Sequence, residues 1–472
     1  MTTELIRFTQ WANDQPQKRF TALMGLLAAA EGLAESYHRQ PTRKAVGVDG
    51  IDKGEYGRQL ETNLADLSAR LKRMGYRPKP SRRVYIPKSS GQGQRPIGIP
   101  CFEDRLVEDR LSRILQAIWE PEFRECSYGF RPDRNAHQAL ARLEHIIVKE
   151  RTQWVYEADL KNFFGSVSHA HMMRFIEHRI GDSNLLRFIR RFLKAGVMDE
   201  GAFSASEQGT PQGNLVSPVL SNIYLHYTLD EWFERCFARQ CRGKAYLVRF
   251  ADDFVACFEF EADARAFERS LKERLQSFGL EIEPTKTALL RFGDLAPILC
   301  KRDGRKRPRT FSFLGFTHYL RVWRNGRISF RRKTEAVRMR RKLTEFGRRL
   351  KSRRTTGARA MQMFTLQHWQ GHLQYFGVSG NTRSVSTYRY HVRRLLFKWL
   401  NRRSQRRSFT WAHFDAWTTT WMPRPGIVHR LGGHPDAKDP TGSRMDAKPT
   451  SGSARAGCCP STAQQPATYT HP

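Results

Sequence analysis

The stretch that most constrains the fold is residues 247–258, LVRFADDFVACF, in which two apolar runs rich in Val and Phe flank an Ala-Asp-Asp step. β-Branched and aromatic residues favour strands, so the pattern predicts a β-hairpin with Asp252 and Asp253 at its tip. Two adjacent carboxylates repel each other and are costly to bury, and a divalent cation removes that cost. Oxygen ligands suit magnesium. For this stretch alone, a polar turn between two core strands is the alternative, because Asp is common in turns.

A third acid ends another apolar run, VYEAD, as Asp159. One carboxylate at the end of a strand and a pair on a neighbouring hairpin can converge on two Mg²⁺ ions. That arrangement serves in-line nucleotidyl transfer, in which one ion activates a 3′-hydroxyl and the other holds a triphosphate. The backbone carbonyl of Leu160 is a further candidate ligand. For Asp159 alone, capping a helix after a strand is the commoner role.

Ordered blocks across roughly residues 40–425 make the chain resemble the reverse transcriptase/maturase proteins encoded by group II introns. Besides the Asp159 stretch, the blocks are RPIGIP (95–100), YGFRP (128–132), QGTPQG (208–213) with Ser217-Pro218, FADD (250–253), Gly279-Leu280 with Lys286-Thr287, and FLGF (313–316). The resemblance implies an α+β right-hand polymerase, with a fingers–palm region built on an antiparallel sheet and followed by an α-helical thumb. It also implies RNA-directed DNA synthesis, assistance in splicing the host intron RNA, and copying of that RNA into DNA during retrohoming.

The resemblance and the changes in composition divide the chain into four expected parts. These are a helical extension with the start of the fingers (1–80), the fingers–palm (81–330), a helical thumb or maturase domain (331–423) and a disordered basic and polar tail (424–472). Family members that cut DNA carry a His-Asn-His nuclease domain after the thumb. No such pattern follows residue 423, so the resemblance implies a lineage that lacks this domain.

Two basic residues are expected to contact the incoming deoxynucleoside triphosphate from a hairpin over residues 84–99. Lys88 and Arg95 stand near the ends of its two strands. Cations there neutralise the charge that develops on the phosphates in a site closed to water. The resemblance assigns this role to both residues, and a solvated basic hairpin is the alternative.

Three further nucleotide contacts come from the resemblance. Phe164, five residues after Asp159, is the candidate ring that excludes a 2′-hydroxyl, although an ordinary core aromatic is the alternative. Gln212, in the glycine-punctuated loop, is the residue expected to touch the nucleotide, and a loop without a ligand is its alternative. Lys286, on an apparent strand over 285–292, is expected to approach the leaving pyrophosphate.

The charge of the chain indicates nucleic acid as the partner. The net charge is +35, the pI is about 10.4, and aromatic residues, 11% of the chain, interleave with the arginines, which suits stacking combined with phosphate contact. No apolar run approaches the ~20 residues of a membrane span, so a membrane partner is not expected. The predicted RNA contacts are Arg131 beside the template, and Arg389, Arg393, Arg394 and Lys398 on amphipathic thumb helices. A structural arginine and a solvated helical bundle are the alternatives.

The expected partners are intron RNA, an RNA template with a DNA primer, target DNA and deoxynucleoside triphosphates. The eight cysteines lack the spacing of a zinc site and the N-terminus lacks a signal-peptide pattern, so a cytoplasmic protein is expected. Two other functions stay open. One is a free-standing bacterial reverse transcriptase of phage defence or CRISPR adaptation. The other is a splicing-only RNA-binding maturase, against which the three intact acids count.

Overall fold

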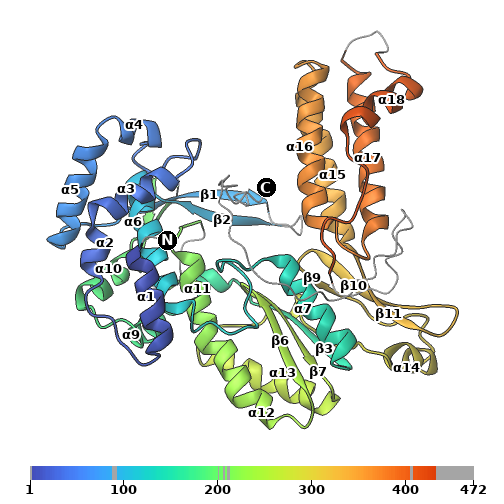
Figure 1. Cartoon of the computed structure of the whole chain (residues 1–472), viewed down its shortest axis with the longest axis horizontal. Helices are drawn as coiled ribbons and strands as arrows, with labels where there is room; N and C mark the ends of the chain where they lie inside the picture. The colour runs from blue at the N-terminus through green and yellow to red at the C-terminus, as the bar shows by residue number, and fades with distance from the viewer. Residues whose placement is uncertain are drawn as a thin grey trace, which may run out of the picture. The chain divides into compact units, whose positions relative to one another are not determined.

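Strands β6 (Ala245–Phe250) and β7 (Asp253–Phe258) form the predicted hairpin. They belong to a four-stranded antiparallel sheet with the order β6-β7-β3-β8, completed by β3 (Trp154–Asp159) and β8 (Ala288–Arg291) (Figure 1). The register pairs the two strand-end acids, because Asp159 lies opposite Asp253. The arrangement of sheets and helices confirms the predicted α+β class.

The computed structural model describes residues 3–87, 93–199, 201–205, 208–209, 213–403 and 408–431. All of these residues lie in one unit, Met1–Gly432. None of the described helices is long and apolar enough to cross a membrane.

The central sheet is buried on both faces, which explains why its strands read as nearly continuous apolar runs. On β7, Phe254, Ala256 and Phe258 lie in one hydrophobic cluster, and the alternating residues Val255 and Cys257 lie in another. Helix α13 (Glu261–Gln276) covers the first face and α7 (Ala136–Lys149) packs against β6. A sheet held from both sides gives its strand ends fixed positions.

The N-terminal part of the chain is helical and packs around one long helix, α6 (Phe102–Trp119). The helices around it are α1 (Thr3–Asp14), α2 (Met24–Ala28), α3 (Ala30–Arg39), α4 (Lys53–Gly57), α5 (Leu60–Lys72), α9 (His169–Glu177), α10 (Ser183–Leu193) and α11 (Ser217–Leu225). Two π-helical turns, His226–Asp230 and Phe233–Phe237, and the short α12 (Ala238–Gln240) continue α11.

A second sheet carries the basic hairpin expected from the sequence. Strands β1 (Ser81–Pro87) and β2 (Gln94–Ile99) pair in antiparallel fashion, and β4 (Val197–Asp199) and β5 (Ala202–Ser204) extend the sheet from β1. Residue 88, and with it the predicted contact Lys88, lies outside the described residues.

A third sheet, β9 (Phe311–Phe313), β10 (Phe316–Val322) and β11 (Ile328–Thr334), follows the short helix α14 (Ala296–Arg302) and leads into the C-terminal helices. These helices are α15 (Ala336–Ser352), α16 (Ala358–Phe376), α17 (Thr382–Leu400) and α18 (Trp411–Trp421). The predicted boundary at residue 330 falls inside β11, and the division into fingers, palm and thumb stays a prediction.

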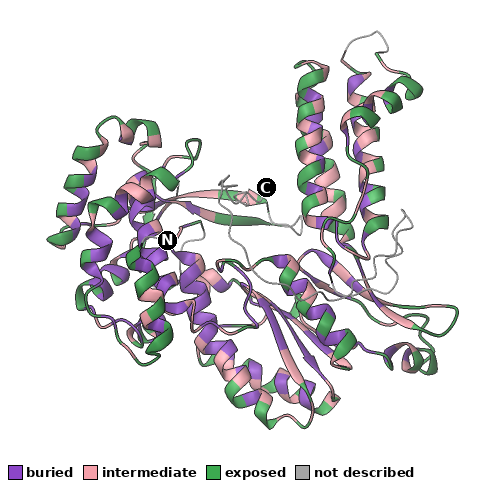
Figure 2. Cartoon of the chain, viewed as in Figure 1, coloured by how far each residue is buried: buried purple, intermediate pink, exposed green. Residues whose placement is uncertain are grey.

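The C-terminal helices bury one stripe each and expose the other side (Figure 2). On α17 the buried residues recur every three or four positions, as expected for an amphipathic helix. The range of the predicted helical thumb, 331–423, includes α18, although the sequence analysis did not single this helix out. Thr410 caps α18 through the backbone of His413, and Trp411 stacks on Phe397 with ring centroids 3.8 Å apart.

Residues 424–431 were predicted to begin a disordered tail, and the structure contradicts that part of the prediction. The backbone N–H of Val428 donates to the carbonyl of Gly377 at 2.6 Å, and Leu431 is buried. A bridge between Val378 and His429 adds to these contacts. Apolar packing therefore continues past α18. Residues 432–472 lie outside the described residues.

Candidate active site

The three predicted carboxylates come together because two strands end at the same edge of the central sheet. Asp159 is the last residue of β3 and lies opposite Asp253, the first residue of β7. Side chains opposite each other in an antiparallel pair have Cβ atoms about 5 Å apart. Asp252 stands in the turn between β6 and β7, next to Ala251, whose φ of 57° is in the left-handed region. The sequence thus folds into one short turn that presents two acids towards a third.

The carboxylates destabilise one another's charged form. Burial, followed by the charges of Asp159 and Asp252, raises the pKa of Asp253 well above its usual range. Burial and the charge of Asp159 raise the pKa of Asp252, while the positive charges of Arg95 and Lys286 oppose that rise. A bound divalent cation relieves this repulsion, and an all-oxygen donor set fits a hard cation.

Lys286 supplies a positive charge to these acids from the protein itself. Its Nζ contacts Oδ2 of Asp159 as a hydrogen-bonded ion pair. Among the described residues, no three His, Cys, Asp or Glu side chains already stand at the spacing of a metal site. The donor types fit a divalent cation, and the ion pair with Lys286 engages Oδ2 of Asp159.

The structure places Lys286 on a single 3₁₀ turn, Pro284–Lys286, and not on the predicted strand. Pro284 has no backbone N–H for a sheet ladder, and the side chain of Glu283 caps the turn at Thr285. Strand β8 begins only at Ala288. Arg95, the other predicted cation, is exposed on β2.

Beneath the β6–β7 turn, Arg249 forms a hydrogen-bond network that the sequence analysis missed. Its side chain is fully buried and pairs with Asp230, which is equally buried. The remaining donors of the guanidinium reach the carbonyl of Ala251 at 3.0 Å, Oδ1 of Asn222 at 3.1 Å and Oγ of Ser127 at 2.8 Å. Arg249 therefore ties the left-handed turn residue to three other parts of the chain, which carry Asp230, Asn222 and Ser127.

Gly129 lies against the same turn. A Cβ on this glycine would collide with the backbone nitrogen of Ala251, so only glycine allows the 128–132 loop to approach so closely. Its carbonyl accepts a hydrogen bond of 2.7 Å from Nδ2 of Asn222. The loop and the β6–β7 turn are thus held together through backbone contacts and Asn222.

Glu157 is a fourth acid that sequence reasoning did not single out. It stands two residues before Asp159, on the same face of β3. Burial raises its pKa to about 7, and the charges of Glu335 and Asp159 act in the same direction. Its Oε1 accepts a hydrogen bond of 3.0 Å from the backbone of Ser312 in β9. In the sequence, the spacing of two acids at positions i and i+2 of an apolar strand could have identified Glu157.

The glycine-punctuated loop lies close to the other predicted nucleotide contacts. An added Cβ on Gly209 would lie 2.8 Å from the carbonyl of Phe164, and one on Gly213 would collide with the carbonyl of Gly98 in β2. Phe164 itself is half-buried, in contrast to the buried neighbour Phe163. Gln212, the residue predicted to touch the nucleotide, lies outside the described residues.

Arg131 is an internal structural residue, so the prediction of an RNA contact does not hold for it. Its side chain is 3% exposed and forms a two-point ion pair with Oε1 of Glu120 at 2.8 and 3.0 Å. It also donates to the carbonyls of Arg124 and Ser127. The alternative weighed from the sequence, a structural arginine, is the one observed.

The four predicted RNA contacts on α17 fall into two pairs. Arg389 donates to the carbonyl of Pro423 at 3.2 Å, and Arg393 pairs with Asp415 of α18, so both hold the C-terminal segment in place. Arg394 and Lys398 are exposed. These two line a cavity of about 550 Å³ whose walls also include His391 and Trp411. The second pair therefore faces a space that a ligand can enter.

Comparison with known proteins agrees with this geometry. Residues 86–318 match the family described as reverse transcriptase (RNA-dependent DNA polymerase). Protein YkfC of Escherichia coli K12 is 33% identical over 336 residues, which cover 64% of this chain and 88% of YkfC. The group II intron-encoded protein LtrA of Lactococcus lactis is 33% identical over 222 residues, 47% of this chain and 37% of LtrA.

A third relative, an uncharacterised 91 kDa protein in the cob intron of Schizosaccharomyces pombe, is 42% identical over 155 residues. Those residues cover 33% of this chain and 19% of the yeast protein. The chain thus spans most of YkfC and well under half of the two intron proteins. The match to the family, the near-complete coverage of YkfC and the carboxylates at the β6–β7 turn lead to one conclusion: the chain belongs to the group II intron-encoded reverse transcriptases, a family of RNA-directed DNA polymerases.

Proposed function

We propose that Asp159, Asp252 and Asp253 hold two Mg²⁺ ions, with the carbonyl of Leu160 as a further ligand, and that the chain copies RNA into DNA at this site. The observation that carries the proposal is the register that sets Asp159 opposite Asp253, beside a turn whose acids have raised pKa values. When bound, such ions promote ionisation of the primer 3′-hydroxyl and neutralise the triphosphate.

Side chains around the acids bind and orient the incoming nucleotide in this proposal. Arg95 and Lys286 supply positive charge to the phosphates, and Phe164 lies under the sugar and excludes a 2′-hydroxyl. Their position supports these roles, because the charges of both cations already act on Asp252. Lys88 and Gln212 are the remaining proposed contacts to the nucleotide, and only the resemblance to the family supports them.

The proposed partner is the RNA of a host intron, which the chain binds, helps to splice and copies during retrohoming. The relatives named as intron proteins support it, as do the exposed Arg394 and Lys398 beside their cavity on α17. Target DNA, a DNA primer and deoxynucleoside triphosphates are the other proposed substrates. The experiment for this partner is to purify the chain from its own host and sequence the RNA bound to it.

One dominant structured RNA that contains this reading frame supports the intron partner. A diffuse mixture of cellular RNAs contradicts it and leaves a free-standing reverse transcriptase as the better description. Recovery of no RNA contradicts RNA binding by the C-terminal helices.

The test of the catalytic proposal is primer extension on an RNA template by Asp252→Ala. Metal ions contribute several kcal/mol to such a step, so we expect a loss of about a thousandfold or more. RNA affinity should stay near the wild-type value, because phosphate contacts lie elsewhere. Asp294→Ala, an exposed aspartate after β8, is the matched control. Substantial synthesis by Asp252→Ala contradicts the metal assignment.

A further inference from the structure

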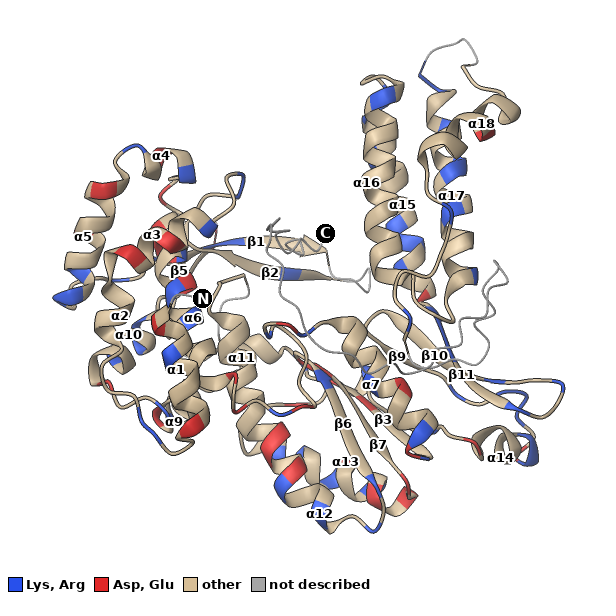
Figure 3. Ribbon diagram, viewed as in Figure 1, with Lys and Arg blue, Asp and Glu red and all other residues tan. Residues whose placement is uncertain are grey.

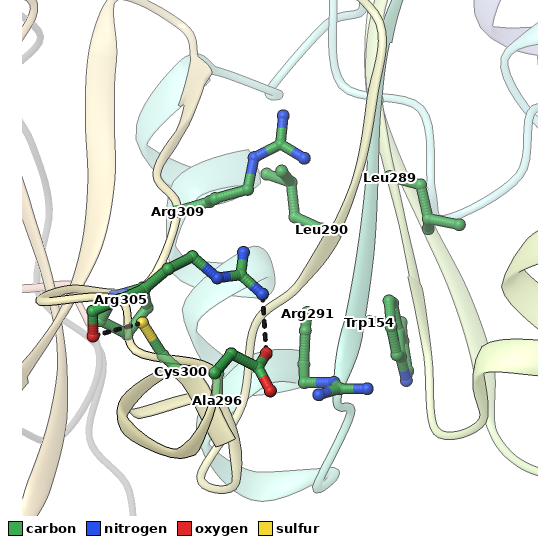
Figure 4. A pocket seen from close by; sticks show the side chains of 10 residues that line it. Trp154, Leu289, Leu290, Arg291, Ala296, Cys300, Arg305 and Arg309 are labelled. Atoms are coloured by element: carbon green, nitrogen blue, oxygen red, sulfur yellow. Dashed lines mark hydrogen bonds and ion pairs between the residues drawn. The ribbon is translucent and has the colours of Figure 1, made fainter. Parts of the chain in front are cut away.

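A small basic cavity lies at the other end of strand β3 from the catalytic acids. It measures about 200 Å³, and its walls include Trp154, Arg291, Arg305 and Arg309 (Figure 4). Trp154 begins β3 and Asp159 ends it, so at about 3.3 Å per residue the two lie roughly 17 Å apart. The cavity is therefore separate from the catalytic site.

The chain beside the cavity is strongly basic. Residues 301–309, KRDGRKRPR, here called the basic loop, contain one acid, Asp303, whose carboxylate pairs with Arg305 at 2.8 Å. Every lysine and arginine of the basic loop is exposed. Asp303 is also the single acid between residues 301 and 333. This density of positive charge attracts a polyanion.

The hairpin formed by β10 and β11 adds stacked side chains to this charge. The guanidinium of Arg321 lies 4.1 Å from the ring centroid of Trp323, and that of Arg331 lies 5.5 Å away. Nε1 of Trp323 donates to Oγ of Ser329 at 2.9 Å, which fixes the indole. An exposed guanidinium lying on an indole offers its outer face to a nucleobase.

The hairpin and the basic loop are anchored on the same side chains. Phe292, which follows β8, packs against Phe311 and Phe330 with centroid distances of 4.9 and 6.0 Å. The basic loop thus leaves and re-enters the fold beside the sheet that carries the hairpin. Figure 3 shows lysine and arginine gathered at α14 and at the outer end of β10 and β11.

We propose that the basic loop and the outer end of the β10–β11 hairpin form a docking surface for folded RNA, apart from the site that holds the three acids. The cavity of about 200 Å³ is smaller than the ~300 Å³ at the low end of small-molecule sites, so it takes a phosphate group. The Arg–Trp stack takes an unpaired base. Loops of folded RNA present unpaired bases together with phosphates, whereas duplex DNA presents its bases stacked and paired.

This proposal rests on the proposed RNA partner, and its test is independent of catalysis. The affinity of the full-length chain for a fluorescent RNA stem–loop is measured without nucleotides at several salt concentrations. The variants are Arg305→Ala with Arg309→Ala, and separately Arg321→Ala with Arg324→Ala. Arg324 is an exposed arginine in the turn between β10 and β11. The matched control is Arg239→Ala with Arg269→Ala, two exposed arginines on α12 and α13. Thermal melts check that each variant is folded.

We expect each of the two double variants to bind RNA about five- to tenfold more weakly. The slope of log affinity against log salt concentration should fall by about 1 for each phosphate group that the variant no longer binds. The control should bind like wild type, and extension of a short preformed template–primer should be unchanged in all variants. Ultraviolet crosslinks to RNA should map to residues 321–331.

The proposal is overturned if both double variants bind RNA with the affinity and the salt slope of the wild-type chain. Competition by duplex DNA as strong as that by RNA also overturns it and assigns the surface to DNA. If the wild-type chain shows no primer extension, that result contradicts the proposed polymerase function and does not affect the proposed docking surface.

Discussion

Arg249 and Asp230 form a fully buried two-point ion pair below the catalytic turn, with Nε to Oδ1 at 2.8 Å and Nη2 to Oδ2 at 2.5 Å. Asp230 ends a π-helical turn, an irregularity that often marks functional sites. The third guanidinium nitrogen donates to the carbonyl of Ala251. The ion pair therefore acts on Asp252 through the backbone and not through the substrate.

Arg249→Lys keeps the charge but loses the two-point geometry and the bond to Ala251. We expect a folded protein whose kcat for primer extension falls about tenfold or more, and which needs a higher Mg²⁺ concentration for half-maximal activity. Asp230→Ala leaves a buried unpaired charge and should cost about 3–5 kcal/mol of the free energy of unfolding. Thermal melts and Mg²⁺ titrations measure these effects. An Arg249→Lys variant with the wild-type Mg²⁺ dependence would show that the contact to Ala251 has no role in positioning.

Lys286 competes with a cation for Asp159, so removing it should strengthen metal binding. An exposed ion pair contributes up to about 1 kcal/mol, so Lys286→Met should bind Mn²⁺ up to about fivefold more tightly. Primer extension should nevertheless fall, because the variant lacks a charge beside the phosphates. Calorimetric Mn²⁺ titration without nucleotide separates the two effects. Lys272→Met, which removes an exposed lysine paired with Glu268 on α13, serves as the control. Weaker Mn²⁺ binding by Lys286→Met contradicts the competition.

Phe164→Val should admit ribonucleotides, because the smaller side chain no longer clashes with a 2′-hydroxyl. We expect the ratio of kcat/KM values for deoxy- over ribonucleotides to fall at least tenfold, measured by single-nucleotide incorporation. Phe163→Leu changes the buried neighbour and should lower stability by about 1 kcal/mol with the ratio unchanged. An unchanged ratio in Phe164→Val makes Phe164 an ordinary packing residue.

The buried carboxyl group of Glu108, in α6, makes the free energy of unfolding depend on pH. Burial raises its pKa to about 8, so the folded chain holds a proton that the unfolded chain releases above about pH 4.3. Stability should therefore fall as pH rises towards 8, with a slope of at most about 1.4 kcal/mol per pH unit from this group. Glu108→Gln should flatten the upper part of this fall, because an amide carbonyl still accepts the N–H of Leu215. Asp104, with a pKa of about 7, contributes in the same direction and remains in the variant. Urea unfolding between about pH 5 and pH 8 measures the slopes, and equal slopes contradict the assignment.

The sequence predicted the elements whose local pattern agrees with their tertiary environment. The β6–β7 hairpin and the position of Asp159 follow from apolar runs that end in acids. Helix α16 also buries a histidine, His372, among its apolar residues. Burial lowers the pKa of His372 well below its usual range, and the ring stacks on Tyr388 with centroids 3.5 Å apart. A neutral imidazole thus packs as an aromatic ring.

The features that sequence reasoning missed depend on partners distant in the chain. The structural roles of Arg131 and Arg249 depend on their carboxylate partners, Glu120 and Asp230, which cannot be identified from local pattern. Helix α18 was missed since its threonines and tryptophans are weak helix formers, and packing on Phe397 decides its structure. Lys286 lies on a 3₁₀ turn and not on the predicted strand, because Pro284 cannot donate a hydrogen bond to a sheet.

Gly129 carries no side chain, yet any larger residue there would displace Ala251 and with it the two neighbouring acids. A survey of random substitutions should therefore find this glycine as intolerant of change as the acids themselves. The number of positions at which a single substitution abolishes DNA synthesis is thus larger than the number of groups that take part in the chemistry. For this turn, the lack of a Cβ atom at position 129 is therefore as necessary as the carboxylates of Asp252 and Asp253.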